Sequence, residues 1–297
     1  MRVLLIFIDG LGIGGNAEEN PFFNLPDAAP LAVFQDSEPN LPHAGILIRT
    51  DARLGVEGRP QSASGQTTML TGVNIPQTLG YHKQGFPNAA MREILDERSI
   101  FLQLEDLGIE PNVFANAYTP QFFTETPRWK SATTVAVEAS TIRFRTLEDL
   151  KNGRAVFHDF TNQLLIERGS DVEPRTPIEA GEILASIAAE HRFTLYEHFI
   201  TDKIGHAQDF SAARAHLPRL AEFVRAVLES VDLAETTVLL TSDHGNIEDL
   251  SVRNHTLNEV PTLVWGKEKD LFAARIKSLA DITPTIVDAL KNDESRN

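Results

Sequence analysis

The chain has 297 residues, of which 27 are basic and 42 are acidic, so its net charge is −15, and it contains no cysteine. This length allows a large core in one domain, or in one domain plus a lobe. The negative charge argues against nucleic acid as a partner, and the missing cysteines exclude disulfides and thiolate zinc sites.

The first expected element is a strand over residues 3–8, where six consecutive apolar residues are typical of a parallel strand buried on both faces. This run is too short to span a membrane and has no signal-peptide cleavage site, which favours a cytoplasmic protein without a membrane partner. Asp9 follows the strand directly. Because the glycines among residues 10–15 prevent a helix from starting there, Asp9 is interpreted as a ligand rather than a helix N-cap.

The segment from Gln61 to Gly72 begins with small and hydroxyl-bearing residues and continues as a short helical stretch. A serine at a helix N-terminus faces free backbone N–H groups and a partial positive charge, which bind phosphate and stabilise an alkoxide. Ser62 and Ser64 are both candidate nucleophiles on this ground. The local pattern leaves open the alternative that Ser62 only caps the helix.

Strands and helices alternate over the rest of the chain. Strands are expected at residues 45–49, 112–118, 193–201, 237–240 and 260–265, and helices at 99–107, 178–191, 217–231 and 283–290. This alternation predicts an α/β fold with a doubly wound, mostly parallel sheet and helices on both faces. Residues 119–176 interrupt the alternation and carry no clear ligand motif.

Two later segments carry residues with metal-ligand chemistry. Asp202 follows a strand and His206 stands four residues later, so a helical turn would bring both to one face as half of a Zn²⁺ or Mn²⁺ site. Asp243 and His244 end the next strand, at the edge where open α/β sheets bind ligands, and His255 follows after a short loop. A simple turn that ends the strand is the alternative for this second segment.

Together these segments resemble the alkaline phosphatase superfamily, and within it most closely the cofactor-independent phosphoglycerate mutases and phosphopentomutases. Laid on residues 61–72 without a gap, the family's nucleophile motif places the nucleophile at Ser62 and not at Ser64. The later family elements, Asp-x-x-x-His, Asp-His-Gly-Asn and His-Thr, match Asp202 with His206, residues 243–246 and residues 255–256.

The resemblance implies an alkaline phosphatase-like core at residues 1–118 and 177–297, with a small cap lobe at residues 119–176 inserted into it. Basic side chains of the lobe could hold a phosphate or carboxylate of the substrate. The candidates are Arg128, Lys130, Arg143 and Arg145. Ordinary solvated surface charge is the alternative for each of them.

Some residues depart from the family patterns. Gln66 stands where the phosphoglycerate mutases carry histidine, and the Arg-Asp-x-Pro-Pro segment with which they hold phosphoglycerate is missing. The chain is also much shorter than these mutases. Formylglycine sulfatases are excluded, because they need proline or alanine, and then arginine, at the positions of Ser64 and Gln66. Phosphoryl transfer is therefore better supported than any particular substrate.

The resemblance also implies two divalent metal ions, Mn²⁺ or Zn²⁺, as cofactors. One ion would be surrounded by Asp9, Ser62, Asp243 and His244, and the other by Asp202, His206 and His255. Ser62 would attack the phosphorus of a small phosphorylated substrate and form a phosphoserine.

Hydrolysis of the phosphoserine is the expected outcome, because a lid of only about 60 residues has few side chains to hold a released intermediate away from water. The alternatives are a phosphomutase of the phosphoglycerate or phosphopentose type, and then a phosphodiesterase. Outside the enzymes, a catalytically silent metal-binding regulatory protein stays open. The sequence also leaves the oligomeric state open.

Overall fold

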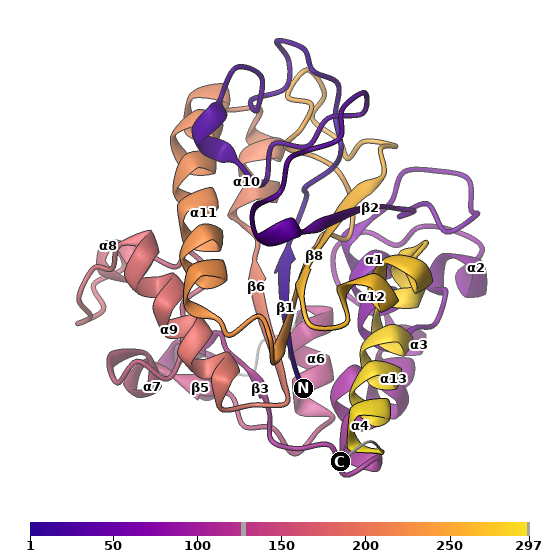
Figure 1. The fold of residues 1–297 in the computed structure, drawn as a ribbon, viewed down its shortest axis with the longest axis vertical. Helices are drawn as coiled ribbons and strands as arrows, with labels where there is room; N and C mark the ends of the chain where they lie inside the picture. The colour runs from indigo at the N-terminus through magenta and orange to yellow at the C-terminus, as the bar shows by residue number, and fades with distance from the viewer. Residues whose placement is uncertain (126–128, 296–297) are drawn as a thin grey trace.

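The computed structural model describes residues 1–125 and 129–295. At its centre is a six-stranded sheet with the order β2-β8-β7-β1-β6-β3 (Figure 1). The strands are β1 (Arg2–Ile8), β2 (Ile46–Thr50), β3 (Asn112–Phe114), β6 (Phe193–His198), β7 (Thr236–Thr241) and β8 (Val260–Gly266). β1 pairs in parallel with β6 and β7, and β3 pairs in parallel with β6. β8 runs antiparallel to both β7 and β2.

Strand β1 lies inside the sheet and contributes side chains to both of its faces. The even-numbered residues from Leu4 to Ile8 join one hydrophobic cluster, and the odd-numbered residues from Val3 to Phe7 join another. All six side chains are buried. The continuous apolar run therefore indicated the strand correctly, since a parallel strand covered on both faces has no polar side.

Helices cover both faces of the sheet (Figure 1). One face carries α9 (Pro177–Ala189) and α11 (Phe210–Ser230), and the other carries α1 (Ser62–Thr71), α4 (Ile100–Asp106), α6 (Ala132–Glu138) and α13 (Ile282–Glu294). Other helices of the structure are α2 (Ile75–Leu79), α3 (Ala89–Arg98), α10 (Ile200–Ala207) and α12 (Lys269–Arg275). This arrangement confirms the doubly wound, mostly parallel α/β fold. Within residues 1–125 and 129–295, no helix has the combination of length and hydropathy that a bilayer-spanning segment needs.

The carboxyl ends of β1, β6 and β7 meet at one edge of the sheet, because these neighbouring strands are parallel. Asp9 directly follows β1. Asp202 lies in the first turn of α10, which begins just after β6, and Asp243 follows the end of β7. The sheet thus brings together three acidic residues that are far apart in the sequence.

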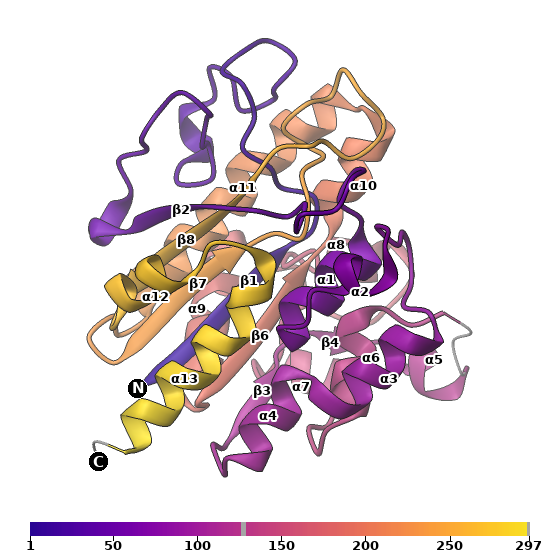
Figure 2. The same ribbon diagram turned by 90° about the vertical axis from the view of Figure 1, so that its right-hand side faces the viewer.

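The segment from residue 119 to 176 contains short elements. They are α5 (Pro120–Thr124), α6, β5 (Arg145–Thr146), α7 (Leu147–Lys151) and α8 (Gln163–Glu167), and β5 pairs in parallel with β4 (Ala117–Tyr118). The strand expected at 112–118 is therefore divided between two sheets. α6 packs into the main core beside α1 and α3 (Figure 2), whereas Leu150, Phe157 and Leu165 belong to a small separate cluster. The division into a core and a cap lobe stays a prediction.

Candidate active site and metal centre

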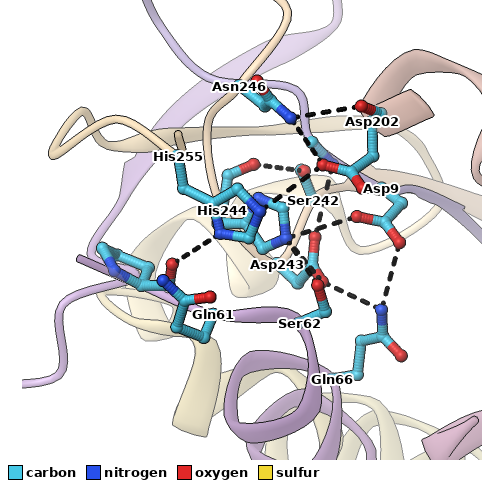
Figure 3. Close-up of polar contacts among 12 residues, drawn as sticks. Asp9, Gln61, Ser62, Gln66, Asp202, Ser242, Asp243, His244, Asn246 and His255 are labelled. Carbon is cyan, nitrogen blue, oxygen red and sulfur yellow. Dashed lines mark hydrogen bonds and ion pairs between the residues drawn. The ribbon is translucent and has the colours of Figure 1, made fainter. Parts of the chain in front are cut away.

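The side chains that the sequence indicated as metal ligands converge at the carboxyl edge of the sheet. Figure 3 shows six of them pointing toward one another, namely Asp9, Ser62, Asp202, Asp243, His244 and His255. His206, on α10, reaches the same place, because its Nε2 atom lies 3.2 Å from Nε2 of His255. The ligands come from the ends of β1 and β7, from the start of α1, from α10 and from the loop before β8.

His244 lies at the centre of the first group of ligands. Its Nε2 atom lies 3.0 Å from Oγ of Ser62, 3.3 Å from Oδ1 of Asp9 and 3.5 Å from Oδ2 of Asp243. Donor atoms of the two aspartates and His244 all lie within 4.8 Å of one another, which suits atoms that share one cation. The structure therefore brings together the four residues assigned to one metal.

Asp202 connects the second group. Its Oδ2 atom lies 3.4 Å from Nε2 of His206, and its Oδ1 atom lies 3.6 Å from Nε2 of His255. The rings of His244 and His255 stack with centroids 3.6 Å apart, so the two groups adjoin. The three residues assigned to the other metal are therefore also together.

Hydrogen bonds to the backbone orient the histidines of the second group. Nδ1 of His206 lies 2.9 Å from the carbonyl oxygen of Arg253, and Nδ1 of His255 lies 2.8 Å from that of Pro60. A neutral ring that donates from Nδ1 has an unprotonated Nε2. Two unprotonated nitrogens repel each other at 3.2 Å, and a cation between them removes this repulsion. The donor set therefore fits a metal ion.

The carboxylates of the first group lead to the same conclusion. Burial raises the pKa of Asp9 well above its usual range, and the neighbouring Asp243 and Asp202 raise it further. Burial also raises the pKa of Asp243 to about 7. Oδ1 of Asp9 is buried and accepts no hydrogen bond. Carboxylates crowded in this way are stabilised by a divalent cation among them.

Ser62 is the first residue of α1 and its side chain does not cap the helix, whose N-cap residue is Gln61. Its hydroxyl group instead lies against His244. Ser64 is buried, and its Oγ atom accepts a hydrogen bond from the backbone N–H of Lys83 at 3.1 Å. The geometry therefore distinguishes a half-buried serine beside the ligand cluster from a buried serine that anchors a loop.

The family model of the metalloenzyme superfamily matches residues 139–294, which is more than half of the chain. The chain belongs to this superfamily. It is similar to a 2,3-bisphosphoglycerate-independent phosphoglycerate mutase from Desulforudis audaxviator, with 37% identity over 95 residues, 30% of this chain and 19% of that protein. It is also similar to a phosphopentomutase from Alkaliphilus metalliredigens, with 23% identity over 194 residues, 63% of this chain and 47% of that protein. The chain thus spans less than half the length of either relative.

Two solved structures are similar in fold to this metalloenzyme. The PH0037 protein from Pyrococcus horikoshii gives a TM-score of 0.56 at 14% identity, over 98% of this chain and 97% of that chain. A cold-active alkaline phosphatase from Shewanella sp. gives a TM-score of 0.56 at 11% identity, over 98% of this chain and 100% of that chain. The family match confirms the expected metalloenzyme superfamily, and these neighbours show that the fold is similar to that of an alkaline phosphatase.

Two side-chain amides hold the aspartates of the candidate metal centre in place. Neither amide was predicted from the sequence as a site residue. Nε2 of Gln66 donates to Oδ2 of Asp9 at 3.2 Å and to Oδ2 of Asp243 at 3.0 Å. Nδ2 of Asn246 donates to Oδ1 of Asp202 at 2.7 Å (Figure 3). A signal existed for both, because Gln66 lies one helical turn after Ser62 and Asn246 belongs to the Asp-His-Gly-Asn element.

Among the described residues, Lys130, Arg143 and Arg145 do not line either of the cavities at Ser62. Lys130 pairs with a glutamate at 2.7 Å, while Arg143 and Arg145 share one aspartate at 2.7 Å and 3.7 Å. Arg128 lies outside the described residues. A role of the other three in substrate binding stays a prediction, which these ion pairs do not support.

Proposed function

We propose that the protein is a metal-dependent phosphoryl-transfer enzyme with Ser62 as nucleophile and a small phosphate ester as substrate. The observation that carries the proposal is the 3.0 Å distance between Oγ of Ser62 and Nε2 of His244, a member of the ligand cluster. Ser62 begins α1, and the N-terminus of a helix favours a phosphate. Membership of the metalloenzyme superfamily and the similarity to two named mutases support the proposal.

Two groups of side chains would hold the cations. Asp9, Ser62, Asp243 and His244 would bind one divalent ion. Asp202, His206 and His255 would bind a second, which His244 also adjoins. Their oxygen and nitrogen atoms suit Mn²⁺ or Zn²⁺. Bound there, the ions would lower the pKa of the serine hydroxyl and offset negative charge on the phosphoryl oxygens.

The reaction proposed for Ser62 is an in-line displacement. Oγ of Ser62 forms a bond to phosphorus while the bond from phosphorus to the ester oxygen breaks. The hydroxyl proton passes to water, and the departing alkoxide takes a proton from water. The phosphoserine then reacts with water to give inorganic phosphate and free Ser62. Gln66 keeps the carboxylates of Asp9 and Asp243 in place throughout, because its amide donates to both.

Hydrolysis is the proposed outcome. A cavity of about 540 Å³ with polar lining residues, among them Gln61, Gln84 and Arg253, reaches Ser62 and offers water a route to the phosphoserine. A phosphomutase is the second candidate, because the similar proteins bear mutase names. A phosphodiesterase and a silent metal-binding protein are the remaining alternatives.

A pair of serine variants tests the nucleophile. Ser62→Ala should lower kcat/KM on phosphate monoesters by at least about 10³-fold without unfolding the protein, because it removes the hydroxyl that lies 3.0 Å from Nε2 of His244. Ser64→Ala should keep most of the activity and lower stability by about 1 kcal/mol, because it loses a buried hydrogen bond. Mass spectrometry of enzyme quenched at low pH should find phosphate on Ser62. Phosphate on Ser64 or Thr67 would contradict the assignment.

A substrate panel distinguishes the candidate reactions. Monoesters, diesters and sugar phosphates should be tried with Mn²⁺ and with Zn²⁺, and we expect release of inorganic phosphate from monoesters. With 3-phosphoglycerate and pentose 1-phosphates, NMR follows phosphate release and isomer formation together. Rapid isomerisation without phosphate release would establish the mutase instead. Binding of two ions without turnover of any ester would favour the silent protein.

A further inference from the structure

A cavity of about 530 Å³ opens beside Ser62, and aromatic rings form much of its wall. The aromatic lining residues are Phe86, Phe114, Tyr118, Phe122, Phe157 and Phe199. Asp9, Ser62 and Asp202 line the same cavity, so its wall continues into the ligand cluster. The phosphoryl transfer itself uses none of these rings.

Contacts among the rings hold this wall in place. The ring centroid of Phe122 lies 4.3 Å from that of Tyr118 and 5.0 Å from that of Phe144. The hydroxyl group of Tyr118 already has a partner, Oγ1 of Thr134 at 2.9 Å. An apolar group that binds against a preformed apolar wall of this kind makes the free energy of binding more favourable, because both surfaces leave water.

The aromatic surface also continues outward from the cavity. Phe86 is 44% exposed and stacks on Trp129, which is 56% exposed, with centroids 6.1 Å apart. Large exposed rings that adjoin an apolar cavity are typical of a ligand-binding surface.

The second cavity at Ser62 has a different lining. Ser62, Gly85 and Asp202 line both cavities. The other described residues that line the second cavity are polar, such as Gln84 and Asn254, and its only aromatic rings among them are imidazoles. A bulky apolar group attached to the phosphate would therefore enter the aromatic cavity and leave the polar one to water.

We propose that the aromatic cavity binds the alcohol part of the substrate, and that this part is an aromatic or similarly bulky apolar group. The inference rests on the proposed function, since it takes Ser62 as the nucleophile. The cavity also has polar lining residues, among them Asn116, Arg168 and Lys203. The hydroxyl groups of a sugar or a glycerate that face the rings would still lose hydrogen bonds to water, whereas an apolar group would not. Burial of a phenyl ring there would favour binding by about 10- to 100-fold.

Non-reactive phosphonates test the cavity without requiring turnover. 3-Phenylpropylphosphonate and propylphosphonate carry the same anionic group and differ only in the phenyl ring. We expect metal-loaded protein to bind the phenyl compound about 10- to 100-fold more tightly in calorimetric titrations. Equal affinities for the two compounds would overturn the inference.

Phe122 and Phe123 provide a matched pair of variants on α5. Phe122 lines the cavity, whereas Phe123 does not line it and is 51% exposed. Phe122→Ala should reduce the preference for the phenyl compound about 5- to 20-fold. Phe123→Ala should reduce it much less, because Phe123 only packs against Phe122 from outside the cavity. Phe122→Leu keeps most of the apolar volume, so this variant should lose less of the preference for the phenyl compound. It serves as the test if the Phe122→Ala variant does not fold. Equal losses at both positions would overturn the assignment.

Phosphate monoesters separate this inference from the proposed function. 2-Phenylethyl phosphate and ethyl phosphate have leaving alcohols of similar reactivity, and we expect kcat/KM to be about 10- to 100-fold higher for the phenyl ester. Turnover of both esters at equal kcat/KM would overturn the inference and leave the proposed function standing. Tighter binding of the phenyl phosphonate without hydrolysis of any ester would overturn the proposed function and support the cavity's preference for apolar groups.

Discussion

Glu248 is a buried carboxylate that ties together the loops carrying the metal ligands. It accepts hydrogen bonds from the backbone N–H of Gly12 at 3.0 Å and of Asn246 at 2.7 Å, and from the side chains of Thr256 and Asn258. These partners belong to the loop after β1, the loop after β7 and the segment after His255. A single side chain therefore fixes the relative positions of three ligand-bearing segments.

Replacement of Glu248 by glutamine should weaken the site. The amide nitrogen would face donors instead of accepting from them, so at least one buried N–H group loses its partner. We expect Glu248→Gln to lower stability by about 1–3 kcal/mol and metal affinity by about 10- to 100-fold, measured by thermal melting and metal titration. Glu259→Gln, at an exposed position, is the control and should change neither. Normal metal affinity in the Glu248 variant would show that the loops are fixed by other contacts.

At the scale of elements, helix α1 packs against the loop after β7 through Gly65. A Cβ atom at this position would lie 2.8 Å from the carbonyl oxygen of Asp243 and 3.1 Å from its Cβ atom. Because these neighbours are backbone and buried side chain, the helix itself would have to move away. The distance between Ser62 and His244 depends directly on this contact, since one residue lies on each side of it.

We therefore expect Gly65→Ala to lower kcat/KM about 10- to 100-fold, because the nucleophile moves from its position beside the ligand cluster. Stability should fall by about 1–3 kcal/mol, as in other overpacked sites. Steady-state kinetics of the metal-loaded enzyme and thermal melting measure the two effects. Gly15→Ala is the control, because a Cβ atom there would meet nothing within 4 Å. Full activity of Gly65→Ala would show that this contact does not position Ser62.

The elements that carry ligands could be predicted because their apolar runs are strong and their ligands follow at once. The first and last residues of these elements could be predicted less well. The helix expected from residue 217 begins at Phe210, since the Asp209 side chain caps it by accepting from the N–H of Ala212 at 2.9 Å. The strand expected to reach Asp202 ends at His198, so Asp202 lies on a helix.

The supporting residues of the site could be predicted least, because their partners are distant in the sequence. Glu248 lies 236 residues from Gly12, and Gln66 lies 177 residues from Asp243. The helical spacing from Ser62 indicates that Gln66 lies near the site, but no local pattern encodes which distant residues Gln66 and Glu248 contact. The ion pairs of Lys130 and Arg143 likewise depend on which acidic side chains the fold brings near them.

At the scale of the whole molecule, the net charge of −15 makes the metal-free site unfavourable, because its carboxylates add to an already negative field. Burial raises the pKa of Asp243 from 3.8 to about 7. A carboxyl group with a raised pKa in the folded state stabilises the fold while protonated, and this contribution is lost as the pH rises through about 7. Because the same group ionises near 3.8 in the unfolded chain, the melting temperature of metal-free protein should fall from about pH 4 to about pH 7. A melting temperature that rises over this range would contradict the shift.

Removal of the metal ions should destabilise the protein, because Asp9, Asp202 and Asp243 repel one another when no cation lies among them. Each ion contributes about 2.7 kcal/mol when its free concentration is about 100 times its dissociation constant. We expect the melting temperature to fall on chelation and to return when Mn²⁺ or Zn²⁺ is added back. Chelation should lower the melting temperature less in the Asp202→Asn variant, which has already lost one of the three carboxylates that repel one another. An unchanged melting curve, after elemental analysis shows complete removal, would contradict a two-metal site.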